Sequence, residues 1–531
     1  MRELVEGRCR GLHARLGLGA QRSQAFPGVC GHAPTLGTAA DIPGRDRDRA
    51  DDCRLREDER AEHRHHERRA DSVRAETRSS DLSVKGRKLA TDCLLNWRLI
   101  VSQTDDSLSI DLTTGVRLAS HYFPRIVDEE LDAALSRAGA VLIEGPKASG
   151  KTATAKRRAN SVVHIDTDPA VSAQMAVDPS LVLEGEAPRL LDEWQLQPRL
   201  WDAVRREVDE RSRRGQFILT GSTAPASSAR RHSGAGRFAR LRMRTMTLAE
   251  SADGNAAVSL RRLLSGEAPR HGAAPLGFDG LLTRMAVGGW PSAVGLPVKD
   301  ALASNRDYVD TVIDVDIDSA GRSRDPLRVR RLMQALARST GTEVSISTLA
   351  RDEATLSRDA VREYMDALSR IFVIEDQPAW SAHLRSSATL RKEPKRHFCD
   401  PSVAVALLGA DATALRRDLS FTGQLFESQV VHDLRVLAQP LGGEVYHARD
   451  SAGREVDAVI QLPDGHWAGF EVKLGAAAET VDAAAASLRE FAANVDGTRA
   501  DSPVLTVITG TGPSYQRADG VNVVALPSLG M

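Results

Sequence analysis

One octapeptide constrains the fold of this 531-residue chain more than any other feature. It is the segment Gly145-Pro146-Lys147-Ala148-Ser149-Gly150-Lys151-Thr152. The segment fits the pattern G-x-x-x-x-G-K-[ST] and lies between a predicted strand, AVLIE, and a predicted helix, TATAKRRA. Its two glycines allow the backbone to curl so that N–H groups and a helix N-terminus face a phosphate. The octapeptide therefore predicts a phosphate-binding loop in an α/β fold.

Two side chains of this loop have predicted roles. Lys151 is expected to reach the β- and γ-phosphates of a nucleotide. Thr152 is expected to offer its hydroxyl to Mg²⁺, a hard cation that takes oxygen ligands. A nucleoside triphosphate with Mg²⁺ is therefore the expected ligand.

An acidic pair, Asp192 and Glu193, follows the apolar residues of the run RLLDEWQ. Such a strand end lies at the edge where a parallel sheet binds ligands. Asp192 is expected to hold the magnesium shell, and Glu193 to orient and polarise the attacking water as a general base. An acidic pair after an apolar run is by itself an ordinary strand end, but the upstream loop favours the functional interpretation.

The next predicted strand, FIL, ends in Thr220-Gly221-Ser222. Either hydroxyl is a candidate to sense the γ-phosphate, and we count Ser222 among the nucleotide-binding residues. The alternative is that both residues cap a strand end, where Ser and Thr are common. The sequence leaves both interpretations open.

Hydrophobic periodicity divides the chain into an expected series of regions. Residues 116–254 alternate strands with helices, as in a parallel sheet with crossover helices. A helix is expected in HYFPRIVDEELDAALSRAG, and strands are expected in AVLIEG, SVVHID, PRLLDE and GQFILTGS. Residues 255–395 are mostly helical, and three helices followed by an extended hairpin suit a winged-helix-like module, for which we favour structural packing over DNA binding. Residues 396–531 form a second predicted α/β region.

The segment 1–115 is expected to be disordered, because it is Arg-rich, charge-dense and without clear periodicity. An alternative is that the natural chain begins near Val116. Four of the five cysteines fall in this segment without the spacing of a zinc site, so all five are expected to be free thiols.

Composition limits the expected partners. Lys and Arg number 71 against 72 Asp and Glu, so nucleic-acid binding would need a local basic patch. An aromatic content of 4% disfavours extensive base stacking. The sequence has no membrane-spanning run and no signal peptide, and a cytoplasmic protein without a membrane partner is expected.

The motifs together resemble bacterial and archaeal AAA-type ATP-binding proteins, which join a P-loop domain to a C-terminal domain of unknown function. The resemblance covers about residues 120–500 and rests on GPKASGKT, LLDEWQ, ILTGS, SGAGRFARLRMRTMTLAES and GGWP. It implies that the nucleotide is ATP and that the chain forms homo-oligomers. It also implies that Arg237 of SGAGR is a finger that contacts the γ-phosphate from its own or a neighbouring subunit.

The C-terminal domain of such proteins resembles a restriction-endonuclease-type fold. Here Glu427 on a helix, Asp457 on one strand, and Glu471 and Lys473 on the next reproduce its acidic-acidic-x-Lys order. The resemblance implies a site in which carboxylates hold magnesium and the lysine positions a water for phosphodiester cleavage. The alternative is an exposed charged strand face.

These features predict an AAA-type ATPase that hydrolyses ATP with Mg²⁺ and has a C-terminal nuclease-like domain that engages DNA, RNA or another macromolecule. The alternative is a nucleotide-switched interaction protein with negligible ATP turnover and no nuclease activity.

Overall fold

The computed structural model describes residues 122–223, 234–321, 324–353, 355–381, 393–449, 453–495 and 503–531. The expectation that residues 1–115 are disordered lies outside these ranges, as do the four cysteines of that segment. The remaining cysteine, Cys399, is buried and has a free thiol, as expected.

A five-stranded parallel sheet contains the phosphate-binding loop. In spatial order its strands are β2 (Ser161–His164), β3 (Arg189–Asp192), β4 (Phe217–Gly221), β1 (Ala140–Glu144) and β5 (Phe238–Arg242). The strands expected in AVLIEG, SVVHID, PRLLDE and GQFILTGS are thus confirmed as β1 to β4. The predicted parallel sheet is also confirmed, and the carboxyl ends of its strands share one edge.

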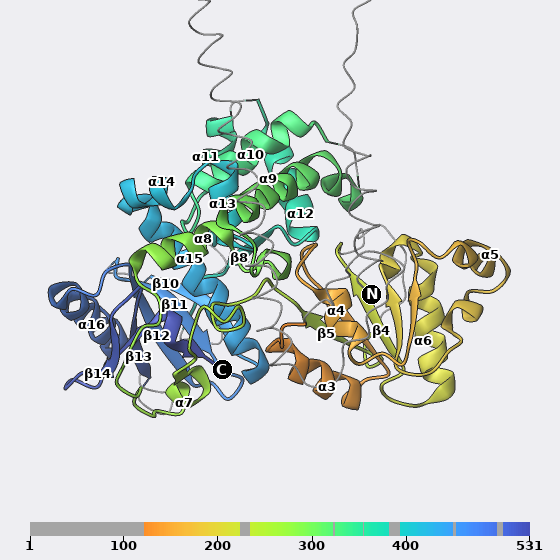
Figure 1. Cartoon of the computed structure of the whole chain (residues 1–531), viewed down its shortest axis with the longest axis horizontal. Coiled ribbons are helices and arrows are strands. Elements are labelled where there is room, and N and C mark those ends of the chain that lie inside the picture. The colour runs from red at the N-terminus through yellow and green to blue at the C-terminus, as the bar shows by residue number, and fades with distance from the viewer. Residues whose placement is uncertain are drawn as a thin grey trace, which may run out of the picture. The chain divides into compact units, whose positions relative to one another are not determined.

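Helices cover both faces of this sheet (Figure 1). They are α3 (Val127–Arg137), α4 (Lys151–Lys156), α5 (Pro169–Val177) and α6 (Arg199–Arg211). Side chains alternate along β1, so Val141 and Ile143 pack with α3 and α4, whereas Leu142 packs with α5 and α6. The buried sheet is therefore a rigid support for residues at its carboxyl edge.

The first helix begins later than the sequence predicts. The pattern HYFPRIVDEELDAALSRAG was expected to be helical, but α3 begins at Val127. The residues before it are non-helical because their side chains contact the phosphate-binding region. The Tyr122 hydroxyl lies 2.8 Å from Thr154 Oγ1, and Arg125 Nη1 donates to the carbonyl of Ser149 at 2.8 Å.

A helical region follows the parallel sheet. Its principal elements are α8 (Phe278–Val287), α9 (Val298–Asp314), α10 (Pro326–Arg338), α11 (Ile346–Glu353), α12 (Arg358–Arg370), β8 (Ile374–Gln377) and β9 (Lys395–Phe398). β8 and β9 pair as an antiparallel hairpin. The helices α10, α11 and α12 are thus followed by a hairpin, which is the element order expected from the sequence.

The C-terminal region contains a mixed seven-stranded sheet. Its spatial order is β10 (Glu444–Arg449), β11 (Glu455–Gln461), β12 (Trp467–Lys473), β13 (Val504–Thr509), β15 (Asn522–Ala525), β14 (Pro513–Gln516) and β7 (Gly272–Ala273). The helix α15 (Leu419–Ala438) packs in one hydrophobic cluster with this sheet, and α16 (Ala478–Ala493) packs in another.

The helical and C-terminal regions share one hydrophobic core. A single cluster extends from Leu248 through the helices to Leu529. Strand β7 adds to the edge of the C-terminal sheet, although it precedes the helical region in sequence. The predicted boundary between residues 395 and 396 therefore falls inside continuous packing, and the division into separate domains stays a prediction.

Arg244, which follows β5, links the parallel sheet to the regions after it. Its Nε and Nη2 atoms lie 3.0 and 2.6 Å from the two carboxylate oxygens of Glu375 in β8, and its Nη1 lies 2.7 Å from Gln439 Oε1. Burial would raise the pKa of Glu375, but Arg244 and Arg435 together hold it well below its usual range. Glu375 is therefore a partly buried carboxylate that depends on its arginines.

We expect Arg244→Met to lower the free energy of unfolding by about 2 kcal/mol, because the variant leaves a partly buried carboxylate short of a partner. The pKa of Glu375 is depressed in the folded state, so its pairing stabilises the fold above the unfolded pKa of about 4.3 and is lost at lower pH. The difference, measured by denaturant unfolding, should be full at pH 7 and shrink below about pH 4.

Arg330→Met is the matched control, because Arg330 pairs with Asp310 on an exposed surface. Its effect should be below about 1 kcal/mol. Equal losses in the two variants would contradict the dependence of Glu375 on Arg244.

Candidate functional site

The loop between β1 and α4 has the tight backbone curvature that a phosphate-binding loop requires. Gly150 has φ +98° and Ala148 has φ +60°. A Cβ atom on Gly145 would lie 2.0 Å from the backbone oxygen of Met243, so only glycine fits there. The sequence therefore forms a tight loop against the end of β5.

Lys151 lies inside this loop. Its Nζ donates to the carbonyl of Pro146 at 2.7 Å, and its side chain is buried. Burial lowers the pKa of Lys151 to about 8, while the nearby Glu193 and Asp192 oppose this shift. The ammonium is thus available to an anion that enters the loop.

Asp192, at the carboxyl end of β3, is the centre of a hydrogen-bonded group. Its Oδ1 accepts from Thr152 Oγ1 at 2.8 Å and from Thr220 Oγ1 at 2.5 Å. Its Oδ2 lies 3.0 Å from Nδ1 of His164, at the end of β2. The expected Asp192 and Thr152 pair is thus assembled, and His164 is a neighbour that the sequence analysis missed, although it also ends a parallel strand.

Glu193 has an unusual backbone conformation, with φ +57° and ψ +42°. Non-glycine residues in this region often mark functional sites. Its Oε2 accepts from Gln195 Nε2 and lies 3.3 Å from Ser222 Oγ. Of the two candidate hydroxyls, that of Thr220 therefore contacts Asp192, and that of Ser222 contacts Glu193.

Arg237 lies at the wrong end of the sheet to contact its own phosphate loop. Its backbone oxygen accepts from Ala140 N at the start of β1, whereas the loop follows the end of β1. At about 3.3 Å per residue, the two ends of β1 are about 13 Å apart. Arg237 instead pairs with Asp209, at 2.8 and 3.2 Å. In this position Arg237 does not reach its own loop, and its contact with a γ-phosphate stays a prediction.

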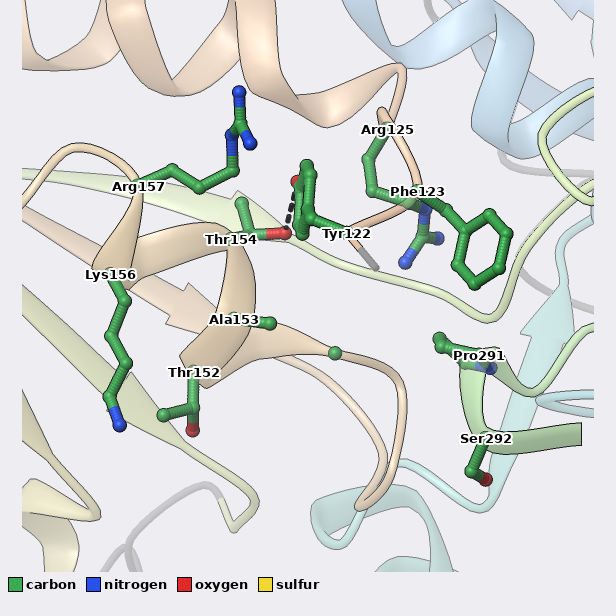
Figure 2. Close-up of a pocket in the computed structure, with 11 residues that line it drawn as sticks. Tyr122, Phe123, Arg125, Thr152, Ala153, Thr154, Lys156, Arg157, Pro291 and Ser292 are labelled. Carbon is green, nitrogen blue, oxygen red and sulfur yellow. Dashed lines mark hydrogen bonds between the residues drawn. The ribbon is translucent and has the colours of Figure 1, made fainter. Parts of the chain in front are cut away.

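A cavity of about 630 Å³ opens beside the loop and α4. It is lined by Tyr122, Phe123, Arg125, Gly150, Thr152, Ala153, Thr154, Lys156, Arg157, Pro291 and Ser292. In Figure 2 the α4 residues Thr152 and Lys156 lie to the left of the view, with Phe123 and Pro291 to the right. The sequence analysis did not single out Tyr122 and Phe123 as cavity residues, because their only signal was an aromatic pair before a helix.

The helical region reaches the loop at two points. Pro291 follows the stretch Gly288-Gly289-Trp290, and its Cγ would lie 3.5 Å from a Cβ on Gly150. Lys147 Nζ lies 2.5 Å from Oδ1 of Asp316, a buried residue in η4 (Asp316–Ala320). Residues far from the loop in sequence thus contact it at two positions.

A second polar cluster lies in the C-terminal region, and it contains all four residues predicted there. Asp457 Oδ2 accepts from the backbone N–H of Val472 at 2.8 Å, so its carboxylate lies beside β12. Lys473 Nζ lies 2.8 Å from Glu471 Oε1. The pKa values of Glu427 and Glu471 are raised to about 7, mainly by burial and secondly by the negative charge of Asp457.

The sequence analysis missed a fifth member of this cluster, Lys395 of β9. Its Nζ lies 2.6 Å from Glu427 Oε1 and 3.7 Å from Asp457 Oδ1. No motif indicated this lysine, because it precedes the predicted boundary of the C-terminal region.

Two kinds of feature are absent from the described ranges. They contain no group of three or more His, Cys, Asp or Glu side chains arranged to hold a metal ion. None of their helices combines the length and the apolar character needed to cross a bilayer.

Family comparisons match three segments of the chain. The AAA domain family matches residues 137–252. Two families described as domains of unknown function match residues 279–414 (DUF8612) and 422–529 (DUF4143). The AAA match contains the loop, Asp192, Glu193 and Arg237, so this segment of the chain is an AAA-type P-loop domain.

Relatives and solved structures were also found. Uncharacterized proteins of Mycobacterium bovis and Mycobacterium tuberculosis are 27% identical over 345 residues, or 64% of this chain and 71% of each relative. The Walker-type ATPase of Pyrococcus abyssi is 13% identical, with a TM-score of 0.34, over 56% of this chain and 99% of its own. AMPPCP-bound DnaA from Aquifex aeolicus is 14% identical, with a TM-score of 0.20, over 46% and 86%. The nuclease-like character of the C-terminal region stays a prediction.

We expect Gly145→Ala to lower the free energy of unfolding by about 1–3 kcal/mol, because its Cβ would meet the Met243 backbone and displace the loop. Gly475→Ala is the control, since a Cβ there meets nothing within 4 Å. Denaturant unfolding of both variants checks the expectation, and an unaffected Gly145→Ala protein would show that the loop is less tightly held than described.

Proposed function

We propose that this chain binds ATP with Mg²⁺ at the loop 145–152 and hydrolyses it to ADP and inorganic phosphate. The observation that carries the proposal is the 2.8 Å contact between Thr152 Oγ1 and Asp192 Oδ1. These are oxygen donors from two separate elements, and such donors suit Mg²⁺. When bound, Mg²⁺ neutralises charge on the phosphates.

The cavity beside α4 supports a place for the nucleoside part of ATP. It adjoins Gly150 and Thr152, so a ligand with its phosphates in the loop could extend into it. Phe123 and Pro291 offer apolar surface to a base, as small-molecule sites commonly do. The ribose would then lie nearer to α4.

The roles of the charged residues follow from their positions. Lys151 binds phosphate oxygens, and a pKa of about 8 leaves most of the lysine protonated at pH 7. Glu193 orients a water and accepts its proton, with its carboxylate held by Gln195 and Ser222. Ser222 is placed to sense whether the γ-phosphate is present, because it contacts Glu193.

The competing function is a nucleotide-controlled interaction protein with negligible turnover. Both functions require ATP binding, and only the first requires Glu193 as a base. The two can therefore be separated by variants that affect binding and hydrolysis differently.

We expect Lys151→Ala to weaken ATP binding about 100-fold, because it removes a buried charge contact to phosphate. Glu193→Gln should bind ATP normally and hydrolyse it about 100-fold more slowly, because it loses only the base. Fluorescent-nucleotide titration and steady-state phosphate release measure the two properties.

Lys299→Ala is the control for these variants, because Lys299 is an exposed lysine in α9. Equal loss of binding in Lys151→Ala and Glu193→Gln would contradict the separate roles. Turnover that is absent in the natural chain would favour the interaction protein.

We also propose that the chain forms homo-oligomers in which Arg237 contacts the γ-phosphate of a neighbouring subunit. Its position far from its own loop and its partly exposed side chain support this role. The pair with Asp209 would then have to open when subunits associate.

A mixture of Arg237→Ala and Lys151→Ala proteins should regain ATP hydrolysis, because each variant supplies the group that the other lacks. Phosphate release is measured across mixing ratios, with size-exclusion chromatography to show that the two assemble together. Co-assembled mixtures without recovery would rule out the contact between subunits.

For the C-terminal region we propose a nuclease-like fold that engages nucleic acid or another macromolecule. The convergence of Glu427, Asp457, Glu471 and Lys473 supports the likeness. Whether that cluster cleaves a phosphodiester depends on what neutralises its carboxylates.

A further inference from the structure

Lys395 bridges carboxylates from two elements of the C-terminal cluster. Its Nζ lies 2.6 Å from Glu427 in α15 and 3.7 Å from Asp457 in β11. The lysine itself belongs to β9 of the hairpin that follows α12. The helical region therefore supplies a cation to acidic groups of the C-terminal sheet.

The bridge is enclosed. The side chains of Lys395, Glu427 and Asp457 are only 8%, 15% and 13% exposed. Burial alone would lower the pKa of Lys395, yet Glu427 and Asp457 raise it above its usual value. The ammonium therefore stays charged next to its two acceptors.

The negative charge of the third carboxylate, Glu471, is also offset by a lysine. Lys473 neutralises Glu471 through Oε1, at 2.8 Å. The other oxygen of Glu471, Oε2, is buried and has no hydrogen-bond partner among the described residues. Three carboxylates thus share two ammonium groups, and one oxygen is still able to accept a contact.

A divalent ion between Glu427 and Asp457 would meet the Lys395 ammonium at close range. Like charges a few ångströms apart repel strongly where water is excluded. Carboxylate oxygens also approach magnesium at roughly 2.0–2.1 Å, so an ion and an ammonium cannot share the same gap.

We propose that the Lys395 ammonium takes the place of a divalent cation at this cluster, so that the natural chain binds no metal there and does not cleave phosphodiesters with it. The region then recognises its partner without cutting it. The inference is independent of ATP binding, which uses Asp192 and a separate loop.

The test is a Mn²⁺ titration of the full chain, freed of metal and without nucleotide, followed by electron paramagnetic resonance. The proteins are the natural chain, Asp457→Asn, Lys395→Met and Lys395→Met/Asp457→Asn. The ATP site is the same in all four, so differences report the C-terminal cluster. We expect the first two to match and Lys395→Met to gain one saturable Mn²⁺ ion per chain, which the double variant loses.

Two outcomes would overturn the proposal. One is Mn²⁺ binding, or Mg²⁺-dependent cleavage of DNA or RNA, in the natural chain that Asp457→Asn removes. The other is a folded Lys395→Met protein, verified by its thermal transition, that gains no ion. Should Lys395→Met fail to fold, Lys395→Gln replaces it, and the comparison of the natural chain with Asp457→Asn still decides the first point.

Discussion

The carboxylate of Asp192 is the contact on which the nucleotide site depends. It joins β3 to α4 through Thr152, to β4 through Thr220 and to β2 through His164. Strand order makes this possible, because β4 lies between β1 and β3 and brings Thr220 beside Asp192. One side chain thus fixes the carboxyl edge of the sheet and the start of the helix that follows the phosphate loop.

The parts of the fold that the sequence predicts well are those with a local cause. The strands β1 to β4 follow from short apolar runs, and the loop follows from its glycines. The start of α3 was placed too early because Arg125 makes a distant contact with Ser149, which periodicity does not encode. Lys395 was missed for a similar reason, since only the folded chain brings it to Glu427.

The arginines near β5 show where a sequence pattern is insufficient. Arg237 and Arg242 are five positions apart, and both fit a phosphate-binding role on charge alone. In the sheet they stand at opposite ends of β5, and only Arg242 is paired in register with the last residue of β1, Glu144. Burial lowers the pKa of Arg242, and its guanidinium lies 4.0 Å from the ring centre of Phe372. The direction of a strand therefore decides which arginine can act within one subunit.

The Asp192 site and the cluster of Glu427 and Asp457 differ in the donors that surround their carboxylates. Asp192 accepts from two hydroxyls and faces an imidazole, and its hydroxyl partners are uncharged. Their hydrogen bonds leave the negative charge available to a cation, and the Thr152 hydroxyl can itself become a ligand. Glu427 and Asp457 are bridged by an ammonium, whose charge already offsets part of their negative charge. The charge of the partner, more than the number of carboxylates, thus distinguishes the proposed Mg²⁺ site from the cluster that contains its own ammonium group.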